Sequence, residues 1–352
     1  MTKCILDNLG GCFGHIKLLY LHKKYQMKQV VILIPNGAVN LSSVHGTYEI
    51  LSRANELWML NGRKSLMEIL IASYEKEVSL NTGYFTITPN NIRDLKKTDL
   101  VIIPSISHEY DKIVKHNKEL ISWIRETYKS GAEVASICTG AFLLAATGLL
   151  DGKTCSTHWN AEKAFKKMFP SITVHIDKLI TAERGIYTNG GAFSFLNMVL
   201  FLVEKYFDRP TAIMCSKIFQ IDIERTSQSA FFVFQAQKNH GDEIVTRAQT
   251  YIEENLSEKI SFEELSEKLA TSRRNFDRRF IKATGNTPVE YLQRVKVEVA
   301  KRTLEEGRKS IFDIMKEVGY SDDKAFRDVF KKITGVSPYE YREKYLNKVA
   351  LA

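Results

Sequence analysis

Cysteine is scarce in this chain, and long apolar runs are missing from it. The 352 residues include only five cysteines, an odd number scattered along the sequence, which does not suit a disulfide framework. No apolar run approaches the roughly 18 residues that a membrane-spanning helix needs, and no secretory leader is recognisable. These absences argue against a disulfide-stapled secreted protein and a membrane protein, and they predict a reduced, cytoplasmic protein with no membrane partner.

Residues 1–26 fit neither of the regions that follow them. They hold two cysteines and two histidines: Cys4, Cys12, His15 and His22. The spacing of these four residues matches no zinc pattern, so we expect no metal site and no cofactor. Met27 directly precedes an apolar strand pattern, and we therefore treat residues 1–26 as a leader of doubtful status, with translation hypothesised to begin at Met27.

An internal repeat occupies the last third of the chain. Between residues 261 and 341 the same pattern occurs twice, 50 positions apart. The matched pairs include Phe262 and Phe312, Glu267 and Glu317, Phe276 and Phe326, Phe280 and Phe330, Gly285 and Gly335, and Pro288 and Pro338. Each copy predicts a first helix, a short polar break and a second helix with inward phenylalanines at i, i+4 spacing. The apolar positions of the first helices are Phe262, Leu265 and Leu269 in one copy and Phe312, Met315 and Val318 in the other. The repeat therefore predicts two helix-turn-helix motifs, which leave the outer face of each second helix free to enter a DNA major groove.

Basic and amide side chains gather on the second helix of each copy. The candidate DNA-binding residues are Arg273, Arg274, Asn275 and Arg278 in the first copy and Lys324, Arg327, Lys331 and Lys332 in the second. Arginine suits bidentate contact with guanine, asparagine suits adenine, and lysine suits phosphate. A charged stripe on a single amphipathic helix is usually only a solvated face, but two copies with matching turns favour DNA contact.

The overall charge supports this interpretation less than it first suggests. The formal net charge is +9, yet residues 241–352 contain 22 Lys and Arg against 20 Asp and Glu, a net of +2. The remaining 28 basic and 21 acidic residues, a net of +7, lie in residues 1–240. We therefore expect DNA affinity to come from local clusters on two helices.

Several stretches of the repeat together resemble the DNA-binding domain of the AraC family of transcription regulators. They are residues 270–280, 285–291, 318–321, 334–335 and 337–342, within a domain expected at 243–346. In that family a long helix, here at about 288–305, joins two motifs that read successive turns of one DNA face. The resemblance implies an all-α domain with two helix-turn-helix motifs.

From Met27 to about Phe207, short apolar strands alternate with helices. The strands are expected at 30–35, 67–74, 100–105 and 133–138, and the helices at 44–60, 117–130, 139–147 and 193–207. Such alternation predicts an α/β fold, a mostly parallel sheet covered on both faces in a flavodoxin-like three-layer sandwich. Ligands bind beyond the carboxyl ends of the strands in such sheets, so the residues just past Pro35, Ser105 and Cys138 are the ones to inspect.

Cys138 stands where a buried strand turns sharply into a helix. This is the geometry of a nucleophile elbow, and the helix N-terminus is expected to favour the thiolate. Residues 136–141, 148–153, 157–159 and 188–192 make 27–207 resemble the class I glutamine-amidotransferase-like, PfpI-type domain found upstream of AraC modules. The order of the two domains is itself characteristic of that group of regulators.

The machinery of a working cysteine hydrolase is incomplete in this region. A histidine follows the cysteine in PfpI-type enzymes, whereas Thr139 stands here; residues 41–46 offer no carboxylate, and Asn197 replaces the usual aspartate. The elbow is therefore interpreted as vestigial, with no catalytic residue. The candidate ligand-binding residues are Cys138, Thr139, His158, Ser105 and Gly190. A redox sensor is a third interpretation, although no second cysteine is identifiably placed to resolve an oxidised Cys138.

Taken together, the two resemblances imply a transcription regulator, and an activator, that responds to a small-molecule effector. Its partners are then double-stranded promoter DNA, RNA polymerase and a second copy of the chain. The alternative is a cysteine-dependent amidase or protease-like hydrolase fused to a DNA-binding domain. Residues 208–242 are expected to link the two domains and to pack partly against one of them, since this stretch is too apolar for a free tether.

Overall fold

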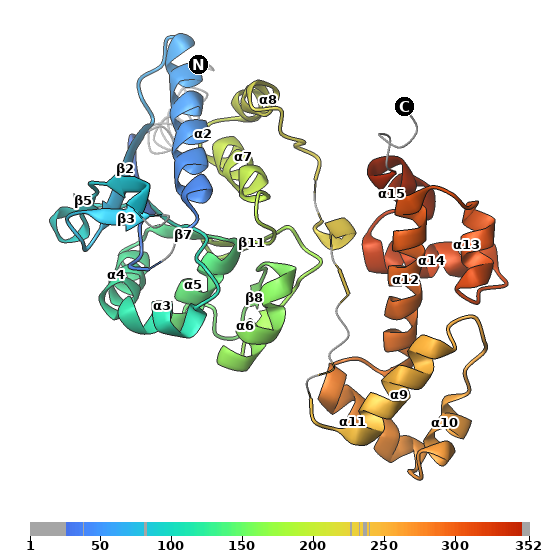
Figure 1. Cartoon of the computed structure of the whole chain (residues 1–352). Helices are drawn as coiled ribbons and strands as arrows, with labels where there is room; N and C mark the ends of the chain where they lie inside the picture. The colour runs from blue at the N-terminus through green and yellow to red at the C-terminus, as the bar shows by residue number, and fades with distance from the viewer. Residues whose placement is uncertain are drawn as a thin grey trace, which may run out of the picture. The chain divides into compact units, whose positions relative to one another are not determined.

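The computed structural model describes residues 26–346 except 38, 81–82, 226, 232, 235–237 and 239. The suggested leader, with Cys4, Cys12, His15 and His22, thus lies outside the described residues apart from its last residue. The chain divides into two compact units between Gln228 and Ser229. Figure 1 shows an α/β unit followed by an all-helical one.

The first unit is built on one seven-stranded sheet with the strand order β10-β11-β7-β6-β1-β2-β5. The strands of the unit are β1 (Lys28–Leu33), β2 (Met67–Ser73), β3 (Val78–Leu80), β4 (Phe85–Ile87), β5 (Asn90–Asn91), β6 (Leu100–Ile103), β7 (Glu133–Ile137), β8 (Thr154–Cys155), β9 (Thr173–Val174), β10 (Ile180–Glu183) and β11 (Ile186–Asn189). The helices are α2 (Leu41–Leu60), α3 (Tyr110–His116), α4 (Lys118–Lys129), α5 (Ala141–Ala146), α6 (Glu162–Met168), α7 (Phe195–Tyr206) and α8 (Arg209–Ile218). Strands β3 and β4 form a separate hairpin, and β8 pairs with β9.

The sheet is parallel except at one edge, where β10 runs antiparallel to β11. Strand β1 lies between β6 and β2, with Val30 opposite Leu100 on one side and Ile69 on the other. Because β6, β7 and β11 are parallel to β1, their carboxyl ends meet at one edge of the sheet. The expected mostly parallel sheet is confirmed, and the sequence pattern missed the β10–β11 pair.

Strand β1 shows why this region forms a three-layer sandwich. Its side chains alternate between two cores: Val30 and Ile32 pack into a cluster with α2, α7 and α8, while Val31 and Leu33 pack into one with α3, α4, α5 and α6. All four side chains are fully buried. A strand buried on both faces reads as a continuous apolar run, and its helices must cover both sides of the sheet.

The segment expected to link the domains is more ordered than its sequence suggests. Helix α8 lies within it, begins with Asp208 as its N-cap and packs against α2 and α7. Its Ala212 and Cys215 are fully buried in the α2 core cluster. Residues 208–228 therefore belong to the first compact unit, and only the stretch after Gln228 connects the units. The serines and threonines of 226–229 obscured the helical pattern that precedes them.

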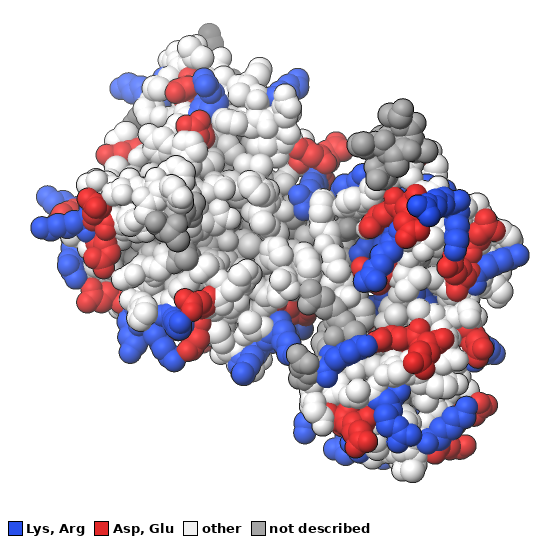
Figure 2. Space-filling model, viewed as in Figure 1, with Lys and Arg blue, Asp and Glu red and all other residues white. Residues whose placement is uncertain are grey.

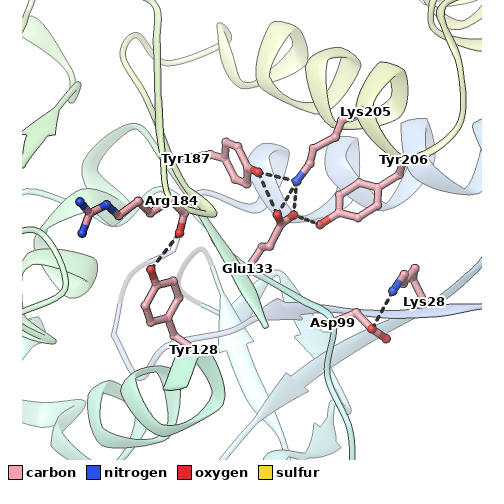
Figure 3. Close-up of polar contacts among 8 residues, drawn as sticks. All are labelled: Lys28, Asp99, Tyr128, Glu133, Arg184, Tyr187, Lys205 and Tyr206. Atoms are coloured by element: carbon pink, nitrogen blue, oxygen red, sulfur yellow. Dashed lines mark hydrogen bonds and ion pairs between the residues drawn. The ribbon is translucent and has the colours of Figure 1, made fainter. Parts of the chain in front are cut away.

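A polar cluster lies at the amino ends of the parallel strands, at the opposite edge from Cys138. The Glu133 carboxylate accepts hydrogen bonds from Lys205 and Tyr206 of α7 and from Tyr187 of β11, as Figure 3 shows. The Lys205 ammonium also lies 4.9 Å from the centre of the Tyr187 ring. These partners raise the pKa of Lys205 against the opposing effect of its burial. The cluster joins α7 to the sheet and has every one of these polar groups paired.

The second unit is all helical, as the sequence predicts. Its helices are α9 (Glu243–Glu254), α10 (Phe262–Lys268), α11 (Arg273–Thr284), α12 (Pro288–Glu306), α13 (Ile311–Glu317), α14 (Asp323–Thr334) and α15 (Pro338–Tyr345). The long helix α12 joins two groups of helices, each with its own core. Phe276, Phe280 and Tyr291 lie at the centre of the first core. Phe326 and Phe330 hold the matching positions of the second.

The register of the repeat differs from the one that the sequence suggests. The second helices, α11 and α14, are 50 residues apart, but the first helices, α10 and α13, are only 49 apart. Phe312, expected inside, is therefore 55% exposed, and Ile314 is buried in its helix. The other two predicted inward residues of this helix, Met315 and Val318, are buried as expected. The second motif has one more residue in its turn, so positions before the turn match at a spacing of 49 and not 50.

The two turns nevertheless share one backbone conformation. Ala270 and Gly319, which are 49 residues apart, both have positive φ, at 52° and 72°. The backbone N–H of each donates to a carbonyl three residues earlier, on Glu267 and Lys316. A left-handed residue ends the first helix sharply and turns the chain into the second helix. No helix within the described ranges is long and apolar enough to cross a membrane.

Candidate functional site

Cys138 occupies the elbow that its sequence predicts. Strand β7 ends at Ile137, and Cys138 begins a 3-10 turn (Cys138–Gly140) that leads into α5. Its φ is +54°, a strained conformation for a residue with a side chain. Gly140 makes the turn possible, since a Cβ there would lie 2.5 Å from the Pro104 carbonyl oxygen at the end of β6.

The surroundings of Cys138 do not activate it. The side chain is only 2% exposed, and burial raises the pKa of the thiol, an effect that hydrogen bonds with Ser105 and Thr139 offset only in part. Tyr110 lies close enough for a charge on Cys138 to add to the effect of burial, which together raise the pKa of Tyr110 to about 12. The expectation that a helix N-terminus favours the thiolate is therefore wrong here, because desolvation outweighs it.

Thr139 has a structural task in the place where related enzymes have a histidine. Its hydroxyl donates to the Ile106 carbonyl at 2.6 Å, accepts from the Ile106 N–H at 3.0 Å, and lies 2.9 Å from the Ser105 hydroxyl. Ser105 in turn donates its N–H to the Ser43 hydroxyl near the start of α2. Cys138, Thr139 and Ser105 are thus brought together, but the hydroxyls fix the loop after β6 and supply no base.

His158 lies at the start of a neighbouring turn. One ring nitrogen, Nδ1, accepts the N–H of Asn160 at 3.1 Å and so caps the short helix that follows. Burial lowers the pKa of His158, and the nearby His108 lowers it further. His108 lies 3.1 Å from the Tyr110 hydroxyl. Because Nδ1 accepts the Asn160 N–H, the neutral ring carries its hydrogen on Nε2 and has no free lone pair to act as a general base.

Gly190 is connected to the elbow through two residues that the sequence did not single out. Thr157 donates its hydroxyl hydrogen to the Cys138 carbonyl at 3.0 Å, and Gln228 donates from Nε2 to the Thr157 carbonyl at 3.0 Å. Both residues are fully buried. A Cβ on Gly190 would stand 2.0 Å from the Gln228 amide nitrogen. Thr157 entered the sequence analysis only as part of the 157–159 stretch and Gln228 only as part of the linker, since the contact between them depends on the tertiary fold.

An open cavity of the first unit lies past the carboxyl ends of β1 and β2, and none of the candidate ligand-binding residues lines it. Its volume is about 510 Å³, and its lining includes Asn36, Ser73, Tyr74, Arg93 and Glu119. Asn36 directly follows Pro35, one of the three positions singled out from the sequence. Arg93 pairs with Glu119 at 2.9 Å and lies over the Tyr74 ring. Two of the charged groups in the lining, Arg93 and Glu119, are therefore paired with each other.

In the first helix-turn-helix motif, α11 presents a basic outer face. Phe276 and Phe280 point into the core, whereas Arg274 and Arg278 are exposed on the other side of the helix. The Arg278 guanidinium donates to Asn275 Oδ1 at 2.9 Å. Arg273 differs, because its Nε donates to both oxygens of Asp277, at 2.9 and 3.0 Å.

Helix α14 presents a more mixed face. Lys324, Arg327, Lys331 and Lys332 are all exposed, as expected for residues that contact DNA. Arg327 pairs with Asp323 at 3.0 Å. An acidic residue, Asp328, stands where the first motif has Arg278. Figure 2 likewise shows basic and acidic side chains interspersed over the visible surface of the helical unit.

The comparisons with known proteins match one family model to each of the two units. A model described as DJ-1/PfpI family matches residues 28–204, and one described as helix-turn-helix domain matches residues 265–344. Among curated proteins, the chain is 25% identical over 227 residues to the HTH-type transcriptional regulator GbdR of Pseudomonas aeruginosa. That alignment covers 64% of this chain and 62% of GbdR, less than two thirds of the relative's length.

Two other comparisons extend this result. The HTH-type transcriptional regulator CdhR of Pseudomonas aeruginosa is 22% identical over 267 residues, which cover 75% of this chain and 78% of CdhR. Among solved structures, a putative transcriptional regulator from Vibrio parahaemolyticus matches with a TM-score of 0.50 at 24% identity, covering 55% of this chain and 99% of that one. The structural match supports the fold of the first unit.

Proposed function

The chain belongs to the DJ-1/PfpI family and carries an AraC-type helix-turn-helix domain behind that region, and we propose that it is a DNA-binding transcription regulator controlled by a small metabolite. The observation that carries the proposal is the pair of helix-turn-helix motifs. Helices α11 and α14 each follow a turn of the same backbone conformation, and each exposes basic side chains on its outer face. The PfpI-like unit is the sensor, and the helical unit binds double-stranded promoter DNA.

The geometry of the helical unit suits binding along one face of DNA. Helix α12 has 19 residues, and at 1.5 Å per residue it spans about 28 Å. This length approaches the roughly 34 Å of one DNA turn, so two motifs joined by α12 suit successive major grooves. Arg274 and Arg278 are the proposed base-reading residues, with Asn275 beside them. Arg273 must exchange Asp277 for DNA before it can contribute a contact of its own.

The second motif is proposed to contribute mainly phosphate contacts. The exposed basic side chains of α14 are three lysines and Arg327, and lysine ammonium groups act on phosphate as point charges. Asp328 makes the outer face of α14 less cationic than that of α11. The sequence preference of the protein is therefore assigned chiefly to α11.

The first unit is proposed to bind a ligand without turning it over. Hydrolysis at Cys138 needs a thiolate and a base, whereas the thiol is buried with a raised pKa and Thr139 holds the place of the base. We assign effector contact to Cys138, Ser105, Thr139, His158 and Gly190. We further propose that the protein is a cytoplasmic activator, that it works as a homodimer, and that it engages RNA polymerase.

The proposal is tested by two substitutions and a selected DNA duplex. Wild-type protein first selects its preferred duplex from a random pool, and binding to that duplex and to scrambled DNA is then titrated. Arg274→Ala should lose about 1–3 kcal/mol on the selected duplex and little on scrambled DNA, because a base contact is lost. Lys331→Ala should weaken binding to both and flatten the salt dependence. Equal loss on both duplexes for Arg274→Ala would contradict the base-reading role.

A further inference from the structure

Ser227 and Gln228, the last residues of the first unit, are held by a set of backbone carbonyls. Ser227 Oγ donates to the Asp177 carbonyl at 2.9 Å, and the Gln228 N–H donates to the same oxygen at 3.2 Å. The Gln228 carboxamide donates from Nε2 to the carbonyls of Thr157, at 3.0 Å, and Lys178, at 3.4 Å. The Gln228 side chain is fully buried. It fills what we call the carboxamide socket, formed by the carbonyls of Thr157 and Lys178 and the backbone of Gly190.

The socket is shaped for a flat amide group. A Cβ at position 190 would stand 2.0 Å from Gln228 Nε2, 2.7 Å from Gln228 Cδ and 2.7 Å from Ser156 Oγ, so the backbone of Gly190 forms one wall of the socket where no side chain fits. A buried backbone approach this close explains why Gly190 is a glycine although its φ is not in the left-handed range.

The Gln228 side chain satisfies the socket only in part. Two backbone carbonyls accept hydrogen bonds from Nε2, and these contacts fix which way the amide is oriented. Oε1 is then a buried acceptor to which none of the described residues donates a hydrogen bond. The Ser194 hydroxyl, 1% exposed, is likewise without a partner among them. Both atoms lie near Gly191, whose Cβ would be 2.6 Å from Ser194 Oγ and 3.7 Å from Gln228 Oε1. An unpaired buried acceptor is unfavourable, so Gln228 is held less tightly than its burial suggests.

The socket also lies between the Cys138 elbow and the end of the first unit. On one side, Thr157 bonds to the backbone of Cys138. On the other, Gln228 is the last residue of the first unit, and the helical unit begins at the next residue, Ser229. Within that unit Phe234 is 8% exposed and donates its N–H to the buried Glu298 of α12 at 3.2 Å. We call residues 227–231, which lead from the socket into the helical unit, the connector. A change at the socket therefore acts directly on the connector.

We propose that the carboxamide socket is a binding site for the primary carboxamide group of a small metabolite, and that Gln228 is its internal competitor. A ligand amide donates to the carbonyls of Thr157 and Lys178 as Gln228 does, and its oxygen accepts from the Ser194 hydroxyl, which Gln228 does not reach. Binding expels the Gln228 side chain and releases the connector. This consequence for regulation rests on the function proposed above, whereas binding in the socket does not.

The test uses the full chain with Gln228→Ala and acetamide, the fragment that this substitution removes. Acetamide should raise the melting temperature of Gln228→Ala and bind it about tenfold more tightly than wild type, whose own side chain competes. Acetone has a similar shape and no N–H group, so it should have no effect. Adding Gly190→Ala to Gln228→Ala places a methyl group in the socket and should abolish the response.

A matched control separates recognition from the filling of any cavity. Gln249 is equally buried but lies in the helical unit, and Gln249→Ala should not respond to acetamide. A similar response in Gln249→Ala, an equal response to acetone, or no response in Gln228→Ala overturns the proposal. If Gln228→Ala is unfolded alone, acetamide must restore its circular dichroism where acetone does not, and failure to do so also overturns the proposal.

Hydrogen exchange measures the release of the connector. In Gln228→Ala the amides of 227–231 should exchange about tenfold faster than in wild type, because the side chain no longer holds them. Unchanged exchange there would rule out the competitor role. Neither measurement uses DNA. Failure of these two measurements therefore overturns the socket proposal alone, and failure of the DNA-binding test overturns the proposed function alone.

Discussion

At Cys138 two influences act on the thiol in opposite directions. Hydrogen bonds with Ser105 and Thr139 favour the charged form, and burial disfavours it. Burial wins, because a side chain only 2% exposed loses nearly all the hydration that a thiolate needs. The elbow geometry therefore remains without the reactivity that usually accompanies it.

We predict that Cys138 in the folded protein reacts slowly with iodoacetamide at neutral pH, with a rate that still rises above pH 9. The folded pKa is raised above the ordinary value of 9.0, so the protonated thiol stabilises the fold below that value and the contribution is lost as pH rises through the folded pKa. Peptide mass spectrometry measures the rate, with guanidinium-unfolded protein as the control. A rate that levels off below pH 9 in intact protein would contradict this.

At the scale of single elements, the turn of each helix-turn-helix motif decides which residues its first helix buries. The turn of the second motif has one more residue, which moves Phe312 to the surface and Ile314 into the core. In both turns a residue with positive φ ends the first helix, alanine in one motif and glycine in the other. The two turns thus have the same left-handed backbone conformation at this position, although one has alanine there and the other has glycine.

Exchanging glycine and alanine between these turns should have opposite effects on stability. Gly319→Ala should cost about 1–3 kcal/mol, because positive φ is strained for alanine and its Cβ would meet the carbonyl oxygens of Leu256 and Ser257, each at 2.7 Å. Ala270→Gly should stabilise the first motif or leave it unchanged, since the strain at Ala270 is relieved. Urea unfolding measures both. A destabilisation of similar size in the two variants would argue against this account.

At the scale of the whole molecule, the chain is two units whose cores are separate. Two apolar clusters cover the faces of the sheet, and two more lie in the helical unit. Units with separate cores can unfold separately, so a single free energy of unfolding does not describe the chain.

We therefore predict two unfolding transitions, each shifted by substitutions in one unit only. Glu133→Gln removes the charged partner of Lys205. It should lower the free energy of unfolding of the α/β unit by about 1–2 kcal/mol, since the pair is partly exposed. Gly319→Ala should lower only the helical transition. Glu126→Gln, which breaks an exposed pair with Lys129, is the matched control and should change neither. A single transition that moves with every substitution would show that the two units unfold together.

Local sequence patterns by themselves determined most of the architecture. Four apolar runs predicted four of the parallel strands, β1, β2, β6 and β7, and the matched phenylalanines predicted both second helices, because each signal depends on neighbours within a few residues. The elbow at Cys138 followed in the same way, from a buried strand that meets a turn. The α/β and all-α character of the two units was therefore readable from the sequence.

Contacts between distant residues decided the rest. The pKa of Cys138 depends on how deeply the fold buries it, and the role of Arg273 depends on whether Asp277 turns toward it. Gln228 and Thr157 are 71 positions apart, so no periodic signal connects them. In sequence Gln228 is one polar residue in a polar stretch. Only the tertiary structure buries its amide against Gly190, because burial is a property of the whole packed unit and not of any segment within it.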